Sequence, residues 1–109
     1  MSAGSATTTI KGYSIRVELR AKAASGLDED AFAGVQAAAA WLAINTPARP
    51  IADMREEYRA ASEGETDADC CDTEYGRLIS ELESVAGVAA TNGWHNPDGC
   101  DVTVDVDAA

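Results

Sequence analysis

The sequence predicts a single α+β domain with the element order β-α-α-α-β. Two observations predict it: apolar and polar residues alternate near both ends of the chain, and the segment between them has the 3.6-residue period of three helices. The length of 109 residues suits one domain, and neither an internal repeat nor a long linker divides it. We therefore expect one small acidic domain over residues 1–109, with residues 1–6 flexible and the helices packed on one face of a small sheet.

The first expected strand runs from Tyr13 to Ala23. Its odd positions are apolar or small and its even positions are polar or charged, as in a half-buried strand. Gly12, which precedes it, can mark a bulge or bend that separates Thr7–Ile10 from this strand. A third strand over Thr7–Ile10, or a sheet shared across a dimer, would make a two-stranded sheet sturdier.

The last expected strand contains Val102, Val104 and Val106, which alternate with polar residues that are mostly aspartates. Its outer face is therefore acidic, whereas the outer face of the first strand is basic. Opposite charges on neighbouring strands stabilise a sheet by roughly 0.2–1 kcal/mol per pair. We expect the N- and C-terminal strands to pair antiparallel.

The first expected helix begins at Asp28, as N-cap, and ends at Asn45-Thr46-Pro47. Trp41 and Ile44 lie opposite its main apolar stripe, and a helix that is apolar all round is either buried on both sides or meets a partner. Trp41 and Ile44 are therefore candidates for self-association or an apolar anchor; alternatively, Trp41 packs under the loop 47–50. The stripe itself comprises Phe32, Val35, Ala39 and Leu42.

Two more helices are expected before the last strand. One begins near Pro50 and runs to about Ser62, and the other begins at Asp72 or Thr73 and stops at Asn92-Gly93, where glycine readily takes the left-handed conformation. Asn96-Pro97-Asp98-Gly99 is a strong turn signal between this helix and the last strand. The inner face of the last helix is expected to comprise Tyr75, Leu78, Ile79, Leu82, Val85, Ala86 and Ala89.

Charge is distributed very unevenly along the chain. Residues 1–23 have a net charge of +3 and residues 24–109 a net charge of −14, for a total of −11. This balance disfavours nucleic-acid phosphates and anionic lipid as direct partners and favours a basic protein. Six carboxylates lie between residues 63 and 74 with no basic residue among them, and such a run repels itself unless something positive binds. The candidate partner-binding residues are Glu56, Glu57, Glu63, Glu65, Asp67, Asp69, Asp72, Glu74, Glu81 and Glu83.

Carboxylates spread over a rigid surface can imitate the phosphates of DNA and occupy the basic channel of a nucleic-acid enzyme. In size and charge the chain resembles small acidic phage-encoded inhibitors of CRISPR effectors and restriction enzymes. The resemblance covers composition and general format and has no shared motif. It implies a non-enzymatic, phage- or mobile-element-encoded DNA mimic that blocks a basic nucleoprotein complex of host defence, without a cofactor.

A second interpretation gives the acidic residues no partner. Lys11 and Lys22 are the chain's lysines, and an acid-rich, lysine-poor composition also fits adaptation to high salt. The protein would then be a structural or assembly protein that forms homo-oligomers, such as a homodimer, through its alanine-rich helix.

Metal binding is the third interpretation. The span from Glu63 to Glu74 has carboxylates at positions 1, 3, 5, 7 and 12 of an EF-hand loop, but Ala68 replaces the glycine required at position 6. A zinc site would use Cys70, Cys71, His95 and Cys100, although adjacent cysteines are unusual ligands for one tetrahedral ion. No metal is therefore assigned, and the role of the three cysteines stays open.

Catalytic and membrane functions have little support. His95 is the only histidine and has no recognisable triad partners, and glycine-rich phosphate loops are absent. The apolar stretch Ala37–Ile44 is less than half the roughly 20 residues of a membrane span. With no evident secretory signal and an odd number of cysteines, we expect a cytoplasmic protein, in the host cell if it is phage-encoded.

Overall fold

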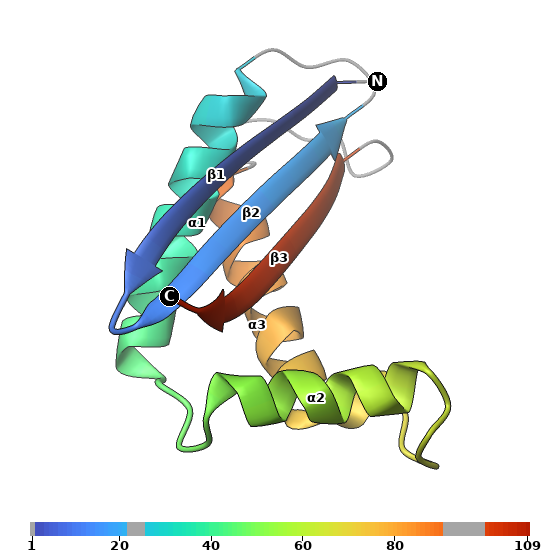
Figure 1. Ribbon diagram of the computed structural model, residues 1–109. Coiled ribbons are helices and arrows are strands. Elements are labelled where there is room, and N and C mark those ends of the chain that lie inside the picture. The colour runs from blue at the N-terminus through green and yellow to red at the C-terminus, as the bar shows by residue number, and fades with distance from the viewer. Residues whose placement is uncertain (1, 22–25, 91–99) are drawn as a thin grey trace.

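The computed structural model describes residues 2–21, 26–90 and 100–109 and confirms the α+β class. Three antiparallel strands form an open sheet in the order β1-β2-β3. Figure 1 shows α1 and α3 behind this sheet and α2 crossing beyond one of its ends. The elements are β1 (Ser2–Ile10), β2 (Tyr13–Ala21), α1 (Leu27–Ile44), α2 (Ile51–Ser62), the short 3-10 helix η1 (Cys70–Asp72), α3 (Glu74–Ala90) and β3 (Cys100–Ala108).

The N-terminal segment forms a complete strand. β1 pairs with β2 from Ser2, opposite Ala21, to Ile10, opposite Tyr13, so residues expected to be flexible belong to the sheet from Ser2 onward. Of the bulge or bend expected at Gly12, the structure has the bend: Lys11 and Gly12 form a tight two-residue turn that separates Thr7–Ile10, now part of β1, from β2. Their φ angles are 49° and 83°, which gives the turn the left-handed conformation that suits the twist of a β-hairpin.

The C-terminal strand pairs antiparallel with β2, as expected. Arg16 lies opposite Asp105, so the expected opposition of charges is present in the register. The ion pairs themselves differ from the expectation. Arg16 and Arg20 both bind Glu18 of their own strand, whereas Asp105 binds Arg55 of α2.

The core lies between the sheet and the two helices behind it. Gly34 brings α1 close to α3: a Cβ atom at this position would lie 3.1 Å from the main-chain oxygen of Ala86. Small side chains therefore let the two helices pack tightly over a narrow sheet. The largest fully buried side chains are Ile15, Val17, Leu19, Val35, Leu42, Leu82 and Val106.

Helix α1 differs from the expectation in three details. Its N-cap is Gly26 in the left-handed conformation, and Asp28 instead lies in the first turn, where it accepts the Ser5 N–H at 3.1 Å. Phe32, expected on the inner stripe, is 58% exposed, because the sheet and α3 occupy the other side of the helix. Trp41 is partly buried against the core, and Ile44 is 83% exposed.

Helix α2 has the expected bounds, but α3 begins at Glu74 because residues 70–72 form η1. Tyr75, Leu78, Leu82 and Ala86 lie on the buried face of α3, as expected. The helix stop at Asn92-Gly93 and the turn Asn96-Pro97-Asp98-Gly99 lie outside the described residues. Within the described parts of the chain, no helix combines the length and apolarity needed to cross a membrane.

Replacement of Gly4 by alanine is expected to destabilise the protein by about 1–3 kcal/mol, the usual cost of an overpacked core. The new Cβ atom would lie 2.4 Å from the carbonyl carbon of Leu27 at the start of α1, so β1 and α1 must separate. Urea unfolding measures the change, and Ala3→Ser, at an exposed position of the same strand, is the control. Equal stability of Gly4→Ala and the wild type would contradict this packing.

Candidate functional site

The acidic surface is the part of the molecule formed by the end of α2, the following loop with η1, and the start of α3. Its carboxylates are all exposed, and the loop lies at the end of α2, away from the sheet (Figure 1). Glu81 and Glu83 lie farther along α3; Glu83 is partly buried, which raises the pKa of its carboxyl although the Val104 main chain hydrogen-bonds to it. The acidic surface thus comprises Glu56, Glu57, Glu63, Glu65, Asp67, Asp69, Asp72 and Glu74.

Arg59 of α2 binds three of these carboxylates. Its guanidinium lies 2.6 Å from Glu56, 2.6 Å from Glu65, and in hydrogen-bond contact with Glu63. The hydrogen bonds from Arg59 lower the pKa of Glu56 and of Glu65 below the ordinary carboxyl value. One arginine therefore gathers carboxylates that would otherwise repel one another.

Arg49, which precedes α2, binds two more carboxylates of the acidic surface. Its Nη1 atom lies 2.7 Å from Glu74 at the start of α3 and 3.5 Å from Glu57 of α2. Arg49 therefore links the segment before α2 to the first residue of α3. The expectation that the acidic run repels itself until a partner binds needs correction, because two arginines outside residues 63–74 offset much of that repulsion.

Asp67, Asp69 and Asp72 remain without a cation. Among the described residues, no basic group lies within ion-pair distance of any of the three. Asp69 does accept the Cys71 N–H at 3.0 Å and so caps η1. These three aspartates form the part of the acidic surface that is available to an external positive charge.

The loop that bears these aspartates has a defined main-chain path. Gly64, with φ of 74°, ends α2, and the Glu65 N–H donates to the Ala60 oxygen at 2.8 Å. The hydroxyl of buried Thr73 donates to the Cys70 oxygen at 2.7 Å and accepts the Gly76 N–H at 3.1 Å. The hydroxyl of Thr73 thus joins η1 to the first turn of α3.

The side chains at the EF-hand positions of this loop do not converge on one point. Glu63 and Glu65, at positions 1 and 3, bind Arg59, and Glu74, at position 12, binds Arg49. In an EF-hand the corresponding side chains converge on one calcium ion. For the zinc interpretation, His95 and the side chain of Cys100 lie outside the described residues; Cys70 and Cys71 are close to each other and to Asp69.

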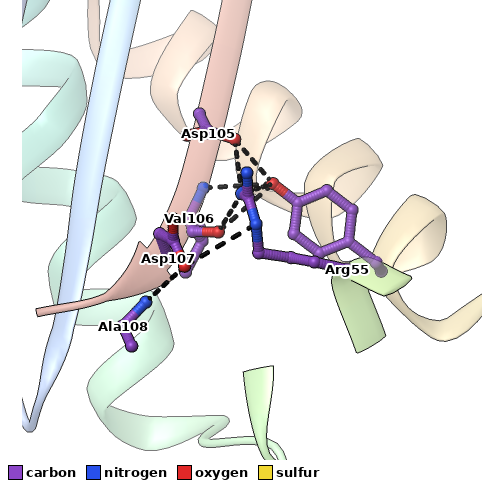
Figure 2. A network of polar contacts seen from close by, with 6 residues as sticks. Arg55, Asp105, Val106, Asp107 and Ala108 are labelled. Atoms are coloured by element: carbon purple, nitrogen blue, oxygen red, sulfur yellow. Dashed lines mark hydrogen bonds and ion pairs between the residues drawn. The ribbon is translucent and has the colours of Figure 1, made fainter. Parts of the chain in front are cut away.

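A polar network that sequence reasoning missed joins α2, α3 and β3. Figure 2 shows Arg55 reaching the last residues of β3, where its Nη1 atom lies 2.7 Å from Asp105 and 2.6 Å from the Val106 oxygen. The Tyr75 hydroxyl donates to Asp105 at 2.8 Å and accepts the Val106 N–H at 3.2 Å. Because Arg55, Tyr75 and residues 105–106 are 20 or more positions apart in the sequence, no local spacing could have predicted this network.

The electrostatics of this network indicate a structural clamp. Burial, above all, raises the pKa of Tyr75 to about 12, so its hydroxyl stays protonated at neutral pH. Burial also raises the pKa of Asp105, but the hydrogen bonds from Arg55 and Tyr75 outweigh this effect and lower it overall. The charged and hydroxyl groups are thus already engaged with one another, and together they hold α2 against the free edge of β3.

An open groove of about 570 Å³ lies beside this clamp, between α2 and β3. Tyr58 and Tyr75 form part of its wall, with ring centroids 5.2 Å apart in an edge-to-face arrangement. Its charged lining comprises Arg55, Arg59, Glu56, Glu63, Asp105 and Asp107, most of which bind one another.

Comparisons of this chain with protein-family models, with curated proteins and with solved structures found no match.

Replacing Tyr75 by phenylalanine is expected to lower the free energy of unfolding by about 1–3 kcal/mol, because the Val106 N–H loses its partner in a buried position. Tyr58→Phe is the matched control, since no described residue hydrogen-bonds to the Tyr58 hydroxyl and its ring stays against Tyr75. Chemical denaturation compares the two variants. If both lose the same stability, the Tyr75 hydroxyl does not hold α3 to β3.

Replacing Arg59 by glutamine is expected to lower the melting temperature by a few degrees at pH 7 and low salt. Arg59 lowers the pKa of Glu56 and Glu65 in the folded state, so its contribution is present above their ordinary value of about 4.5 and is lost as the pH falls below it. The difference between wild type and variant should therefore shrink by pH 3 and in 1 M salt (about a 3 Å screening length). Arg77→Gln is the control, because exposed Arg77 forms no ion pair with a described residue. If the difference in melting temperature between wild type and Arg59→Gln did not depend on pH, the ion pairs of Arg59 would not be its cause.

Proposed function

We propose that this protein is a non-enzymatic inhibitor that binds a basic, nucleic-acid-binding protein surface through its acidic surface. The most concrete form of the proposal is a phage- or mobile-element-encoded DNA mimic that blocks a host defence complex. The observation that supports it best is the set of three aspartates, Asp67, Asp69 and Asp72, which lie on a loop with a defined path and have no cationic partner among the described residues.

Because of where the arginines lie, this loop carries the negative charge of the acidic surface that no described arginine offsets. Arg49 and Arg59 reduce the field of the carboxylates near α2 but bind none of the three loop aspartates. A rigid array of uncompensated carboxylates steers a basic protein toward it and competes with phosphates for the same cationic groups. The net charge of −11 adds to this long-range attraction at low ionic strength.

The clearest test removes charge from the loop without changing its main chain. The double substitution Asp67→Asn and Asp72→Asn is expected to weaken binding to a purified CRISPR surveillance complex or restriction endonuclease by about tenfold at low salt, an effect of order 1 kcal/mol. Asp69 is left in place because its carboxylate also lies beside the thiols of Cys70 and Cys71. Binding by wild type should also decrease steeply with salt, since the surface charges are exposed.

The matched control is Glu29→Gln with Asp53→Asn, which removes the same charge from the first turns of α1 and α2. Affinity measured by titration, together with release of DNA from the complex, distinguishes specific from diffuse attraction. An equal loss in both double variants would mean that only net charge matters. Unchanged affinity after the loop substitutions would rule out the loop as the binding site.

A second candidate function is homo-oligomeric assembly. Phe32 and Ile44 on α1 are 58% and 83% exposed, and exposed large apolar side chains favour association. Trp41, the other expected anchor, is instead partly buried against the core. A homo-oligomer that persists in 1 M salt and ignores nucleoprotein complexes in light scattering would favour assembly over inhibition.

A further inference from the structure

Cys70 and Cys71 lie next to each other in η1, between α2 and α3, and their side chains converge with that of Asp69. The two Sγ atoms and a carboxylate oxygen of Asp69 all lie within 4.8 Å of one another. We propose that Asp69, Cys70 and Cys71 form a site for one soft divalent cation of the zinc and cadmium class. The proposal does not depend on the inhibitor function, since cation binding can be measured on the isolated chain.

The local conformation explains how adjacent cysteines can serve the same ion. Adjacent side chains in a strand point to opposite faces, whereas the tight turn of η1 places both thiols beside Asp69. The Asp72 N–H donates to the main-chain oxygen of Asp69 at 2.9 Å, and the Cys71 N–H donates to the carboxylate oxygen Oδ1 of Asp69 at 3.0 Å. These bonds fix the turn and leave the second carboxylate oxygen of Asp69 for a cation.

Packing against α3 holds the same turn from the other side. A Cβ atom at Gly76 would lie 2.2 Å from the Cys70 oxygen, so the first turn of α3 rests directly on the Cys70 main chain. The Thr73 hydroxyl also donates to this oxygen, at 2.7 Å. The candidate ligands are therefore arranged before any cation arrives, which reduces the ordering cost of binding.

The ligand set selects the class of cation. Two thiolates and one carboxylate suit zinc or cadmium, whereas calcium and magnesium prefer oxygen ligands. Three protein ligands leave a fourth tetrahedral position for water or another ligand. Cys70 is partly buried and Cys71 is exposed, so solvent can reach the cluster.

Binding exchanges protons for the cation. The hydrogen bond with Cys70, followed by the charges of Cys70 and Asp69, raises the pKa of the Cys71 thiol. Because cysteine binds these cations as the thiolate, a divalent cation displaces the thiol protons, and a site that is −1 with neutral thiols remains −1 with two thiolates and the cation bound. The acidic surface thus keeps its net charge while its turn becomes cross-linked.

The test is a titration of the reduced full-length protein with cadmium, followed by the ultraviolet thiolate-to-cadmium charge-transfer band. We expect saturation at one cadmium per chain, release of about two protons, and competition by zinc. Cys70→Ser and Cys71→Ser should each weaken binding at least about tenfold, and Asp69→Asn, which can still cap η1, should weaken it by a smaller factor. The wild-type melting temperature should rise with zinc, because the cation binds the folded turn.

Two matched controls locate the site. Asp67→Asn removes a carboxylate from the same loop outside the cluster, and Cys100→Ser removes the remaining cysteine; both should leave cadmium affinity within about twofold. A signal that survives the double substitution of Cys70 and Cys71 would overturn the proposal. So would an equal loss with Cys100→Ser, two chains per cadmium in light scattering, or no cadmium band in the wild type.

Discussion

The close packing of α1 against both the sheet and α3 is the constraint on which the rest of the structure depends. Gly4 lets β1 pass directly beneath the start of α1, and Gly34 lets α1 approach the main chain of Ala86 in α3. A chain with few large apolar residues can build a dense core only when its elements approach this closely. The small residues at the buried positions of β1 and α1, such as Gly4, Ala31, Gly34 and Ala38, are therefore a packing requirement.

The attachment of α2 uses a different kind of interaction. Arg55 and Tyr75 bind the exposed edge of β3 through Asp105 and the main chain of Val106, and Arg49 ties the segment before α2 to Glu74. These contacts set the direction of α2 and the position of the loop that follows it. Arg49 and Arg55 thus position the acidic surface. Its charge that is not offset by a described arginine lies mostly on the loop aspartates.

The turn η1 positions both a carboxylate of the acidic surface and the two thiols. Asp69 caps η1, contributes a carboxylate to the acidic surface, and lies beside both thiols. Thr73 and Gly76 hold this turn against α3, so neither the aspartates nor the thiols depend on a long, freely moving loop. The proposed partner-binding surface and the proposed cation site can therefore occupy one small region without requiring different backbone conformations.

The sequence by itself determined β2, β3 and the three helices, because period-two and period-3.6 patterns are local properties of the chain. It also predicted the antiparallel pairing of β2 and β3, because the charge on the outer face of each strand can be read from that strand alone. It also located the acidic surface. Only the tertiary structure decided that β1 extends back to Ser2, since its inward positions Gly4 and Ala6 are small to accommodate α1 and show no apolar alternation. Likewise, three features depend on contacts between distant segments, which no local pattern encodes: the exposure of Phe32, the ion pair from Arg49 to Glu74, and the Arg55 clamp.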